Sequence, residues 1–149
     1  MTEEEFQADL QTKYPQIWAV LNKPGVYEIE MGVPLRTIID EFAGGVRDGK
    51  KVKAVIPGGV SANVLKASEI DVAYDFDSLA KAGTMMGSSA VMVFDEDTDI
   101  VEVAYRTIKF FNHESCGQCT PCREGTNWLK SMIREFMDNA GSEELMQRV

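Results

Sequence analysis

Basic residues are scarce in this sequence, and there is a single histidine. Lysine and arginine together number 15, against 24 aspartate and glutamate residues, which gives a formal net charge of −9. Binding to nucleic acid requires a basic face that neutralises phosphates, and anionic membrane surfaces attract basic segments. The composition therefore predicts that neither a nucleic acid nor a membrane surface is a partner.

Cysteine is also scarce, and its number is odd. The chain has three cysteines, whereas a secreted disulfide framework normally uses an even set. The first residues are Met1, Thr2 and three glutamates, which lack the basic-then-apolar pattern of a signal peptide. No apolar run approaches the length of about 20 residues that crosses a bilayer. We therefore predict no direct membrane insertion and a reducing location, either cytoplasmic or on the inner side of a membrane complex.

The sequence lacks the common phosphate-binding and catalytic patterns. It contains neither G-x-G-x-x-G nor G-x-x-x-x-G-K-[ST], so we interpret the Pro57-Gly58-Gly59 segment as a plain turn after a strand. We find no Ser-His-Asp set and no pair of carboxylates with a base. Independent catalysis by this chain is therefore not predicted.

Hydrophobic periodicity predicts an α+β fold in the first two thirds of the chain. Residues 1–16 are expected to form an arm or a short helix over residues 2–11, and residues 17–95 a small β-grasp-like mixed sheet with one main helix. The expected elements begin with a hairpin, whose strands are residues 17–21 and 26–31 and whose turn is 22–25. The main helix starts at Pro34, carries Leu35, Ile38, Ile39 and Phe42 on one face, and ends at Gly44 and Gly45. After it we expect a strand (51–56), a helical turn (61–66), an irregular segment or short strand (71–76), a brief helix (79–82, capped by Ser78 and ended by Gly83) and a last strand (89–94).

The pattern becomes helical over residues 96–149, with the boundary near residues 95–99. The acidic residues there are expected to cap a helix whose apolar stripe runs from Ile100 to Phe111. A second stripe runs from Trp128 to Met137, with the helix ending at 139–141 and a third helix possible at 142–145. We predict a partial helical bundle in this part of the chain.

All three cysteines lie between the two helical stripes. Cys116, Cys119 and Cys122 have the spacing C-x2-C-x2-C, which favours an iron–sulfur cluster. Two alternatives remain open: a zinc site in which His113 is the fourth ligand, and thiol redox chemistry by a Cys-x-x-Cys pair. Thr120 and Pro121 predict a helix start, with Thr120 as its cap and Cys122 in its first turn. Gly117 would allow a tight turn, and Arg123 would add positive charge.

Residues 114–125, Glu-Ser-Cys-Gly-Gln-Cys-Thr-Pro-Cys-Arg-Glu-Gly, closely resemble the cluster motif of the flavoprotein (F) subunit of respiratory complex I, NADH:quinone oxidoreductase. Related diaphorase subunits of NAD-reducing hydrogenases and formate dehydrogenases carry similar motifs. The resemblance covers roughly residues 18–140. Upstream, it rests on segments similar to the family's soluble-ligand-binding β-grasp (SLBB) domain: 22–28, 42–45, 56–59, 75–79 and 92–95.

The resemblance implies a role in electron transfer. In the family, NADH reduces FMN, and a four-iron, four-sulfur (4Fe–4S) cluster passes electrons on towards quinone. By position, Cys116, Cys119 and Cys122 would be three of its ligands, and the family's fourth is a downstream cysteine that this sequence lacks. The family's FMN- and NADH-binding domain is not matched either. We therefore expect a fragment that is inactive alone, whose parent joins other subunits of a respiratory or diaphorase complex, peripheral to a membrane. The alternative is an interaction module with structural zinc or with empty, reduced thiols.

Overall fold

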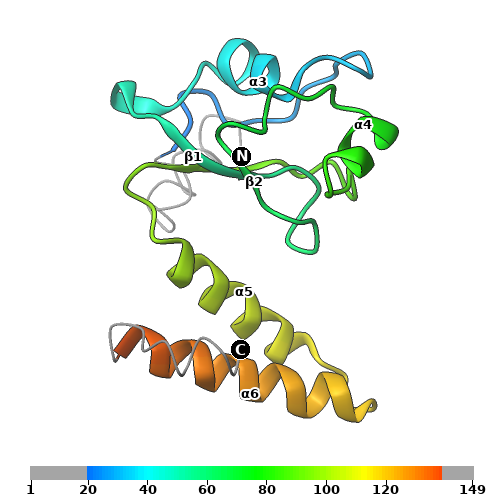
Figure 1. Cartoon of the computed structure of the whole chain (residues 1–149), viewed down its shortest axis with the longest axis vertical. Coiled ribbons are helices and arrows are strands. Elements are labelled where there is room, and N and C mark those ends of the chain that lie inside the picture. The colour runs from blue at the N-terminus through cyan, green and yellow to red at the C-terminus, as the bar shows by residue number, and fades with distance from the viewer. Residues whose placement is uncertain (1–19, 139–149) are drawn as a thin grey trace, which may run out of the picture. The chain divides into compact units, whose positions relative to one another are not determined.

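The computed structural model describes residues 20–138 (Figure 1). The chain divides into two compact units, one ending at Thr98 and the other beginning at Asp99. The predicted N-terminal helix, most of the first predicted strand, the predicted end of the last long helix and the third helix of the bundle lie outside the described residues.

A three-stranded antiparallel sheet forms the centre of the first unit. Strand β1 (Val52–Ile56) lies between β2 (Leu65–Lys66) and β3 (Met92–Asp95), so the strand order is β2-β1-β3. In the register, Val55 faces Leu65 on one side and Val93 on the other. β1 ends in three consecutive buried residues, the pattern of a central strand that is covered by neighbouring elements. The α+β class predicted from the sequence is confirmed.

The predicted main helix is also confirmed, although it is irregular. It consists of α3 (Leu35–Thr37) and a π-helical turn, η1 (Ile38–Phe42). Leu35, Ile38 and Ile39 are buried, as their spacing predicts, whereas Phe42, predicted on the same face, is 37% exposed. Gly44 and Gly45 follow with φ angles of +70° and +73°, the left-handed region that glycine enters at little cost. The two glycines therefore end the helix.

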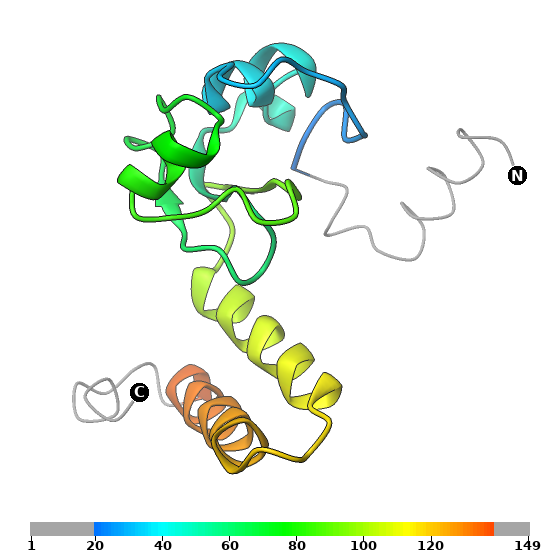
Figure 2. The same cartoon turned by 90° about the vertical axis from the view of Figure 1, so that its right-hand side faces the viewer.

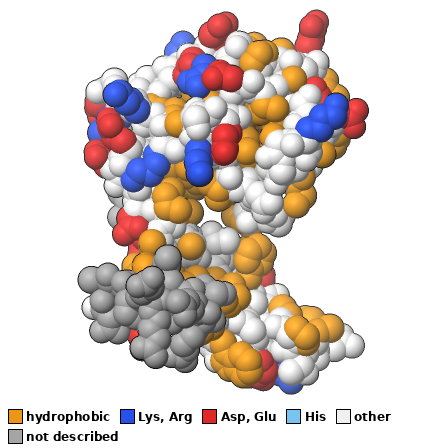
Figure 3. Space-filling model, viewed as in Figure 1, with side chains coloured by type: hydrophobic (Ala, Val, Ile, Leu, Met, Phe, Trp, Pro, Cys, Tyr) orange, Lys and Arg blue, Asp and Glu red, His pale blue; other side chains and the backbone are white. Residues whose placement is uncertain are grey.

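The core of this unit joins the helix face to the sheet. Its members are apolar residues, with one tyrosine, that expose less than a tenth of their surface: Leu35, Ile38, Ile39, Val55, Leu65, Ile70, Tyr74, Leu79 and Val93. Apolar side chains also reach the surface of the protein (Figure 3), among them Val60, Val64 and Met85.

The predicted hairpin is wrong. Residues 26–31 form no strand, and Val26 is fully exposed. Leu21 instead pairs with Val46, and the Asn22 N–H donates to the Gly45 carbonyl at 3.0 Å. The Asn22 amide also donates to the Gly44 carbonyl at 2.7 Å. The partner of residues 21 and 22 is therefore the segment just after the main helix, residues 44–46, which is distant in sequence. It replaces the predicted strand at 26–31 as the source of hydrogen-bond acceptors.

The residues predicted as a helical turn at 61–66 include a strand instead. Leu65 lies in β2 and is buried opposite Val55 of β1. The Lys66 N–H donates to the Glu69 carboxylate at 2.8 Å rather than to a carbonyl of a preceding helical turn. Pairing with the edge of β1 buries Leu65 better than a single helical turn would. The segment after it, up to Asp75, is irregular with one bridge between Pro34 and Ala73, as expected.

The brief helix begins earlier than predicted. Helix α4 (Phe76–Lys81) is capped by Asp75, whose carboxylate accepts hydrogen bonds from the Ser78 N–H at 2.7 Å and from the Ser78 hydroxyl at 3.0 Å. Ser78 is thus the third helical residue rather than the cap. The backbone hydrogen bond from Ser78 holds the pKa of Asp75 below its ordinary value. Gly83, with φ +79°, follows the helix as predicted.

The last strand of the sheet is also shifted. β3 begins at Met92 instead of Ser89, because Ser89 adopts a left-handed φ of +59° that is incompatible with a strand. It continues to Asp95, one residue beyond the predicted end. Asp95 is buried, and its carboxylate accepts from the Thr98 hydroxyl at 2.6 Å. This hydrogen bond, together with Lys50, keeps the pKa of Asp95 below its ordinary value.

Tyr74 connects the core to the turn after β1. Ionisation of its phenol should lower the stability of the folded protein at alkaline pH. The hydroxyl donates to the Pro57 carbonyl at 2.7 Å, and burial raises the pKa of Tyr74 above its ordinary value near 10. The unfolded chain therefore ionises first, so the contribution of the neutral phenol is present below about pH 10 and is lost as the pH rises through the folded pKa.

We predict that Tyr74→Phe costs about 1 kcal/mol at neutral pH, because the Pro57 carbonyl loses its donor. Above about pH 10 the variant should lose stability less steeply than the original chain. Urea unfolding followed by circular dichroism at both pH values measures the two effects. Parallel pH profiles for the two proteins would show that the phenol does not ionise differently in the folded state.

Candidate functional site

Two helices of the second unit carry the cysteine motif. Helix α5 (Ile100–Glu114) is capped by Asp99, whose carboxylate accepts from the Val101 and Glu102 N–H groups at 2.8 and 3.3 Å. The predicted acidic cap is therefore confirmed. Helix α6 (Thr120–Asp138) follows after a short connection (Figures 1 and 2).

The two helices pack against each other through polar as well as apolar groups. The Lys130 ammonium donates to the Asn112 side-chain carbonyl at 2.7 Å, and the Asn112 amide donates to the Thr126 hydroxyl at 3.2 Å. The Arg134 guanidinium lies 5.7 Å from the centre of the Tyr105 ring. Neither helix contains a fully buried residue within its described span. The predicted apolar stripes are therefore only partly covered by this packing.

The connection between the helices, residues 115–119, and the first turn of α6 hold the three cysteines. All three are exposed and free of disulfides. Gly117 has φ +75° with open space where a Cβ would lie, so it makes the tight turn that was expected. Its N–H donates to the Ser115 hydroxyl at 3.3 Å, and the Cys122 thiol approaches the same hydroxyl at 3.4 Å.

The helix starts one residue earlier than the sequence suggested. The Arg123 N–H donates to the Cys119 carbonyl at 2.9 Å, so Cys119 occupies the cap position and Thr120 is already helical. Cys122 lies in the first turn, as predicted. Pro121 also lies in this turn, where its missing N–H leaves no hydrogen bond unmade. The free N–H groups and the positive end of the helix dipole are therefore beside two of the thiols.

The structure does not gather the predicted ligands around one point. Over residues 20–138, no three side chains of histidine, cysteine, aspartate or glutamate lie close enough together to hold a metal ion. His113 is near the end of α5, largely exposed, with its Nδ1 atom 2.9 Å from a Glu114 carboxylate oxygen. The thiols nevertheless suit iron–sulfur chemistry as a donor set, because they are accessible thiolate precursors within one loop and turn. They are three of the four that such a cluster needs.

Two contacts of this loop were not expected from the sequence. The Ser115 hydroxyl accepts from the loop, and the Arg123 guanidinium donates to the Gly117 carbonyl at 2.8 Å. A serine two residues before a glycine is a known turn former, so this pattern was a usable signal. The role of Arg123 had no local signal beyond its charge, because it depends on how the loop folds back on the helix.

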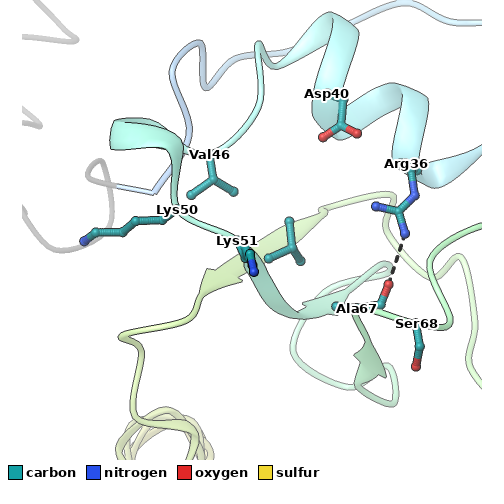
Figure 4. Close-up of a pocket in the computed structure, with 8 residues that line it drawn as sticks. Arg36, Asp40, Val46, Lys50, Lys51, Ala67 and Ser68 are labelled. Atoms are coloured by element: carbon teal, nitrogen blue, oxygen red, sulfur yellow. Dashed lines mark hydrogen bonds between the residues drawn. The ribbon is translucent and has the colours of Figure 1, made fainter.

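The first unit contains a groove with a cavity volume of about 440 Å³. Figure 4 shows its lining, in which Arg36 points to the Ala67 carbonyl at 3.2 Å. Arg36 also pairs with Asp71, which keeps the pKa of that carboxyl below its ordinary value. Lys50 pairs with Asp97 at 3.0 Å and with Asp95 at 3.5 Å. Acidic partners thus neutralise two of the three cations in the lining, Arg36 and Lys50, and leave Lys51 as the third. The groove is therefore a weaker candidate for a functional site than the cysteine loop.

Comparison with known proteins assigns both units. Residues 20–103 match the family described as the SLBB domain. The chain belongs to this SLBB domain family. Residues 102–149, which include all three cysteines, match the NADH-ubiquinone oxidoreductase-F iron-sulfur binding region. The β-grasp and cluster-motif resemblances drawn from the sequence are thus both confirmed.

Individual relatives agree with the family assignment. The chain is 53% identical over 121 residues to an F subunit of the NADH-quinone oxidoreductase of Rhizobium meliloti, a match that covers 81% of this chain and 29% of the relative. It is 47% identical over 127 residues to the F subunit of the NADH-quinone oxidoreductase of Rickettsia typhi, a match that covers 84% of this chain and 30% of that relative. The chain therefore spans less than a third of the length of these curated relatives.

A solved structure shows the same fold. An NAD+-reducing NiFe hydrogenase in its H2-reduced state matches with a TM-score of 0.72 and 29% identity, over 86% of this chain and 21% of the hydrogenase chain. As to membranes, none of the helices in the described part of the chain combines the length and the apolar character needed to cross a bilayer.

Proposed function

We propose that this chain provides three of the ligands of a 4Fe–4S cluster in an NADH-oxidising flavoprotein subunit. The ligands are Cys116, Cys119 and Cys122, and the fourth comes from outside these 149 residues, which contain no other cysteine. The observation that carries the proposal is that the exposed three-cysteine loop falls within the match to the iron-sulfur binding region. A cluster bound there would take up and release single electrons.

The local structure suits this role. The positive end of α6 lies beside Cys119 and Cys122 and favours a net-negative group. Gly117, with φ +75°, turns the backbone tightly between Cys116 and Cys119. Exposure of all three sulfurs lets them turn towards a common cluster without unpacking a core, since neither α5 nor α6 has a fully buried residue in its described span.

The rest of the electron-transfer chain is assigned to the parent protein. We propose that NADH and FMN bind there, outside residues 1–149, and that this piece alone neither binds NADH nor turns over. Its partners are other subunits of a respiratory or diaphorase complex, peripheral on the inner side of a membrane. Phe110 and Trp128, which are 52% and 63% exposed on α5 and α6, support the idea that this unit is covered by further protein.

A structural zinc site is the second candidate. The observation that favours it is that His113 lies in the last turn of α5, three residues before Cys116, so that His113 and the three cysteines supply four ordinary zinc ligands. The pairing of His113 with Glu114 is typical of a metal-bound histidine, whose second ring nitrogen usually contacts a carboxylate.

Anaerobic reconstitution with iron, sulfide and zinc all supplied, followed by analysis of the three, separates the two candidates. We expect the chain to take up iron and acid-labile sulfide and to develop a broad visible absorption, in a cluster that a supplied thiol stabilises at its fourth position. His113→Ala and the matched exposed-surface control Asn127→Ala should both leave the iron content unchanged. One equivalent of zinc without sulfide, lost in His113→Ala and kept in Asn127→Ala, would reject the iron–sulfur proposal.

A further inference from the structure

Arg123 contacts the cysteine loop more extensively than its charge alone requires. Its Nη1 atom donates to the carbonyls of Gly117 and Gln118, at 2.8 and 3.3 Å, and its Nη2 atom contacts the Thr120 hydroxyl at 3.4 Å. Its Nε atom donates to the Glu124 carboxylate at 2.9 Å. Each donor-bearing nitrogen of the guanidinium is therefore engaged, and the side chain bridges the loop and the first turn of α6.

These contacts fix the direction of two peptide groups. The peptide bonds of the described residues are all trans, so the N–H of each peptide points opposite to its carbonyl. When the Gly117 and Gln118 carbonyls face Arg123, the N–H groups of Gln118 and Cys119 face away from it. No hydrogen bond within residues 20–138 uses either of these N–H groups. They are therefore oriented but available.

We propose that Arg123 is a positioning residue that turns the Gln118 and Cys119 N–H groups towards the sulfur atoms of the cysteine site. Ser115 holds the other side of the same loop through its contacts with Gly117 and Cys122. Backbone N–H donors near sulfur raise the reduction potential of a cluster and stabilise thiolate ligands. The inference rests on the proposed function for the identity of the bound group, but the orientation of the loop is a property of the metal-free chain.

The shape of the guanidinium, rather than its charge, is what this role requires. A lysine at position 123 keeps the positive charge but has a single ammonium point donor instead of a planar fork. Arg123→Lys and Arg123→Gln should therefore have similar effects. Arg106 provides a matched control, since it is also exposed and paired with a glutamate, Glu102, at 2.7 Å, but it lies on α5 away from the loop.

Backbone relaxation measurements on the metal-free 149-residue chain test the positioning directly. We expect amide order parameters of about 0.85 at Gln118 and Cys119 in the original chain and below about 0.6 in both Arg123 variants. The corresponding Arg106 variants should leave them unchanged. Unchanged order parameters in Arg123→Lys would overturn the proposal, because charge alone would then suffice to hold the loop.

Metal uptake supplies the second readout. In a titration with Co²⁺, followed by its thiolate charge-transfer band, both Arg123 variants should bind about tenfold or more weakly, as is typical when a partner of a metal ligand is lost. In the reconstituted protein the cluster potential should shift negative in both. If the original chain binds Co²⁺ but assembles no cluster, the proposed function fails while the positioning role stands. Full rescue of affinity by lysine would overturn the positioning role alone.

Discussion

Replacing Gly58 with alanine should destabilise the first unit by about 3 kcal/mol, the upper end for overfilling a packed site. Gly58 is buried in the turn after β1. A Cβ there would overlap the Met85 carbonyl oxygen and lie 2.7 Å from the carbonyl carbon and oxygen of Met86. All three obstructing atoms belong to backbone, so no side-chain rotation relieves the overlap, and the turn and the loop at 85–89 must separate.

The separation would affect more than one hydrogen bond. The Ser88 N–H donates to the Gly58 carbonyl at 3.2 Å, and the Gly59 N–H donates to the Ala90 carbonyl at 2.8 Å. Both bonds connect the turn after β1 to the segment that enters β3. Urea unfolding followed by the amide signal of the fully buried Val55 measures the loss in this unit.

Gly125→Ala is the matched control for the glycine replacement. Gly125 lies inside α6, and an added Cβ would meet nothing within 4 Å. The change should stabilise the helix by about 0.5 to 1 kcal/mol, because alanine loses less backbone entropy than glycine in a helix. If Gly58→Ala is as well tolerated as Gly125→Ala, the close approach of the two backbone segments is wrong.

The parts of the fold that the sequence predicted correctly depend on local signals. The buried positions Leu35, Ile38 and Ile39 follow from helical spacing, and the end of that helix follows from a glycine pair. The cap at Asp99 follows from an acidic residue before an apolar stripe. Each of these features is determined within a few residues of the chain, so periodicity and capping chemistry are sufficient.

The failures concern non-local partners. Residues 26–31 alternate as a strand should, but Leu21 pairs with Val46 instead. Leu65 lies in β2, an edge strand that pairs with β1. This pairing depends on Val55, its partner from a different part of the chain, and not on the residues next to Leu65. The start of α4 was predicted wrongly for a different reason. Asp75 and Ser78 are both good N-cap residues, and only the folded backbone, in which the Asp75 carboxylate accepts from the Ser78 N–H, shows that Asp75 is the cap.

The same distinction applies to the site. The spacing of the cysteines and the approximate helix start at Thr120 could be predicted, because both are written in adjacent residues. The contacts of Arg123 with Gly117 and Gln118 could not, because they arise only after the loop turns back over α6. The gathering of the three sulfurs stays a prediction, since it requires the bound group itself to draw the ligands together.

Replacing Cys119 with serine should abolish cluster assembly while preserving the helix. Cys119 is at the cap of α6, where its carbonyl accepts from the Arg123 N–H. Serine is among the best cap residues, worth about 1 kcal/mol over residues that cannot cap, so α6 should form at least as well as before. A hydroxyl has almost no anionic character at neutral pH and is a poor ligand for iron in a cluster. Losing even an indirect partner of a metal ligand costs about tenfold or more in metal affinity. Loss of a ligand itself should therefore lower the iron and sulfide content after reconstitution at least about tenfold.

Gln118→Ser is the control that makes this loss interpretable. It places the same side chain one position away, in the same loop, and keeps the backbone carbonyl that Arg123 contacts. Circular dichroism should show equal helix content for the two variants, and only Cys119→Ser should lose iron and sulfide. Full iron uptake by Cys119→Ser would remove Cys119 from the ligand set, and the spacing that first indicated the cluster would then reduce to the pair Cys116 and Cys122. Equal loss in both variants would instead show that the conformation of the loop, and not the thiol, limits assembly.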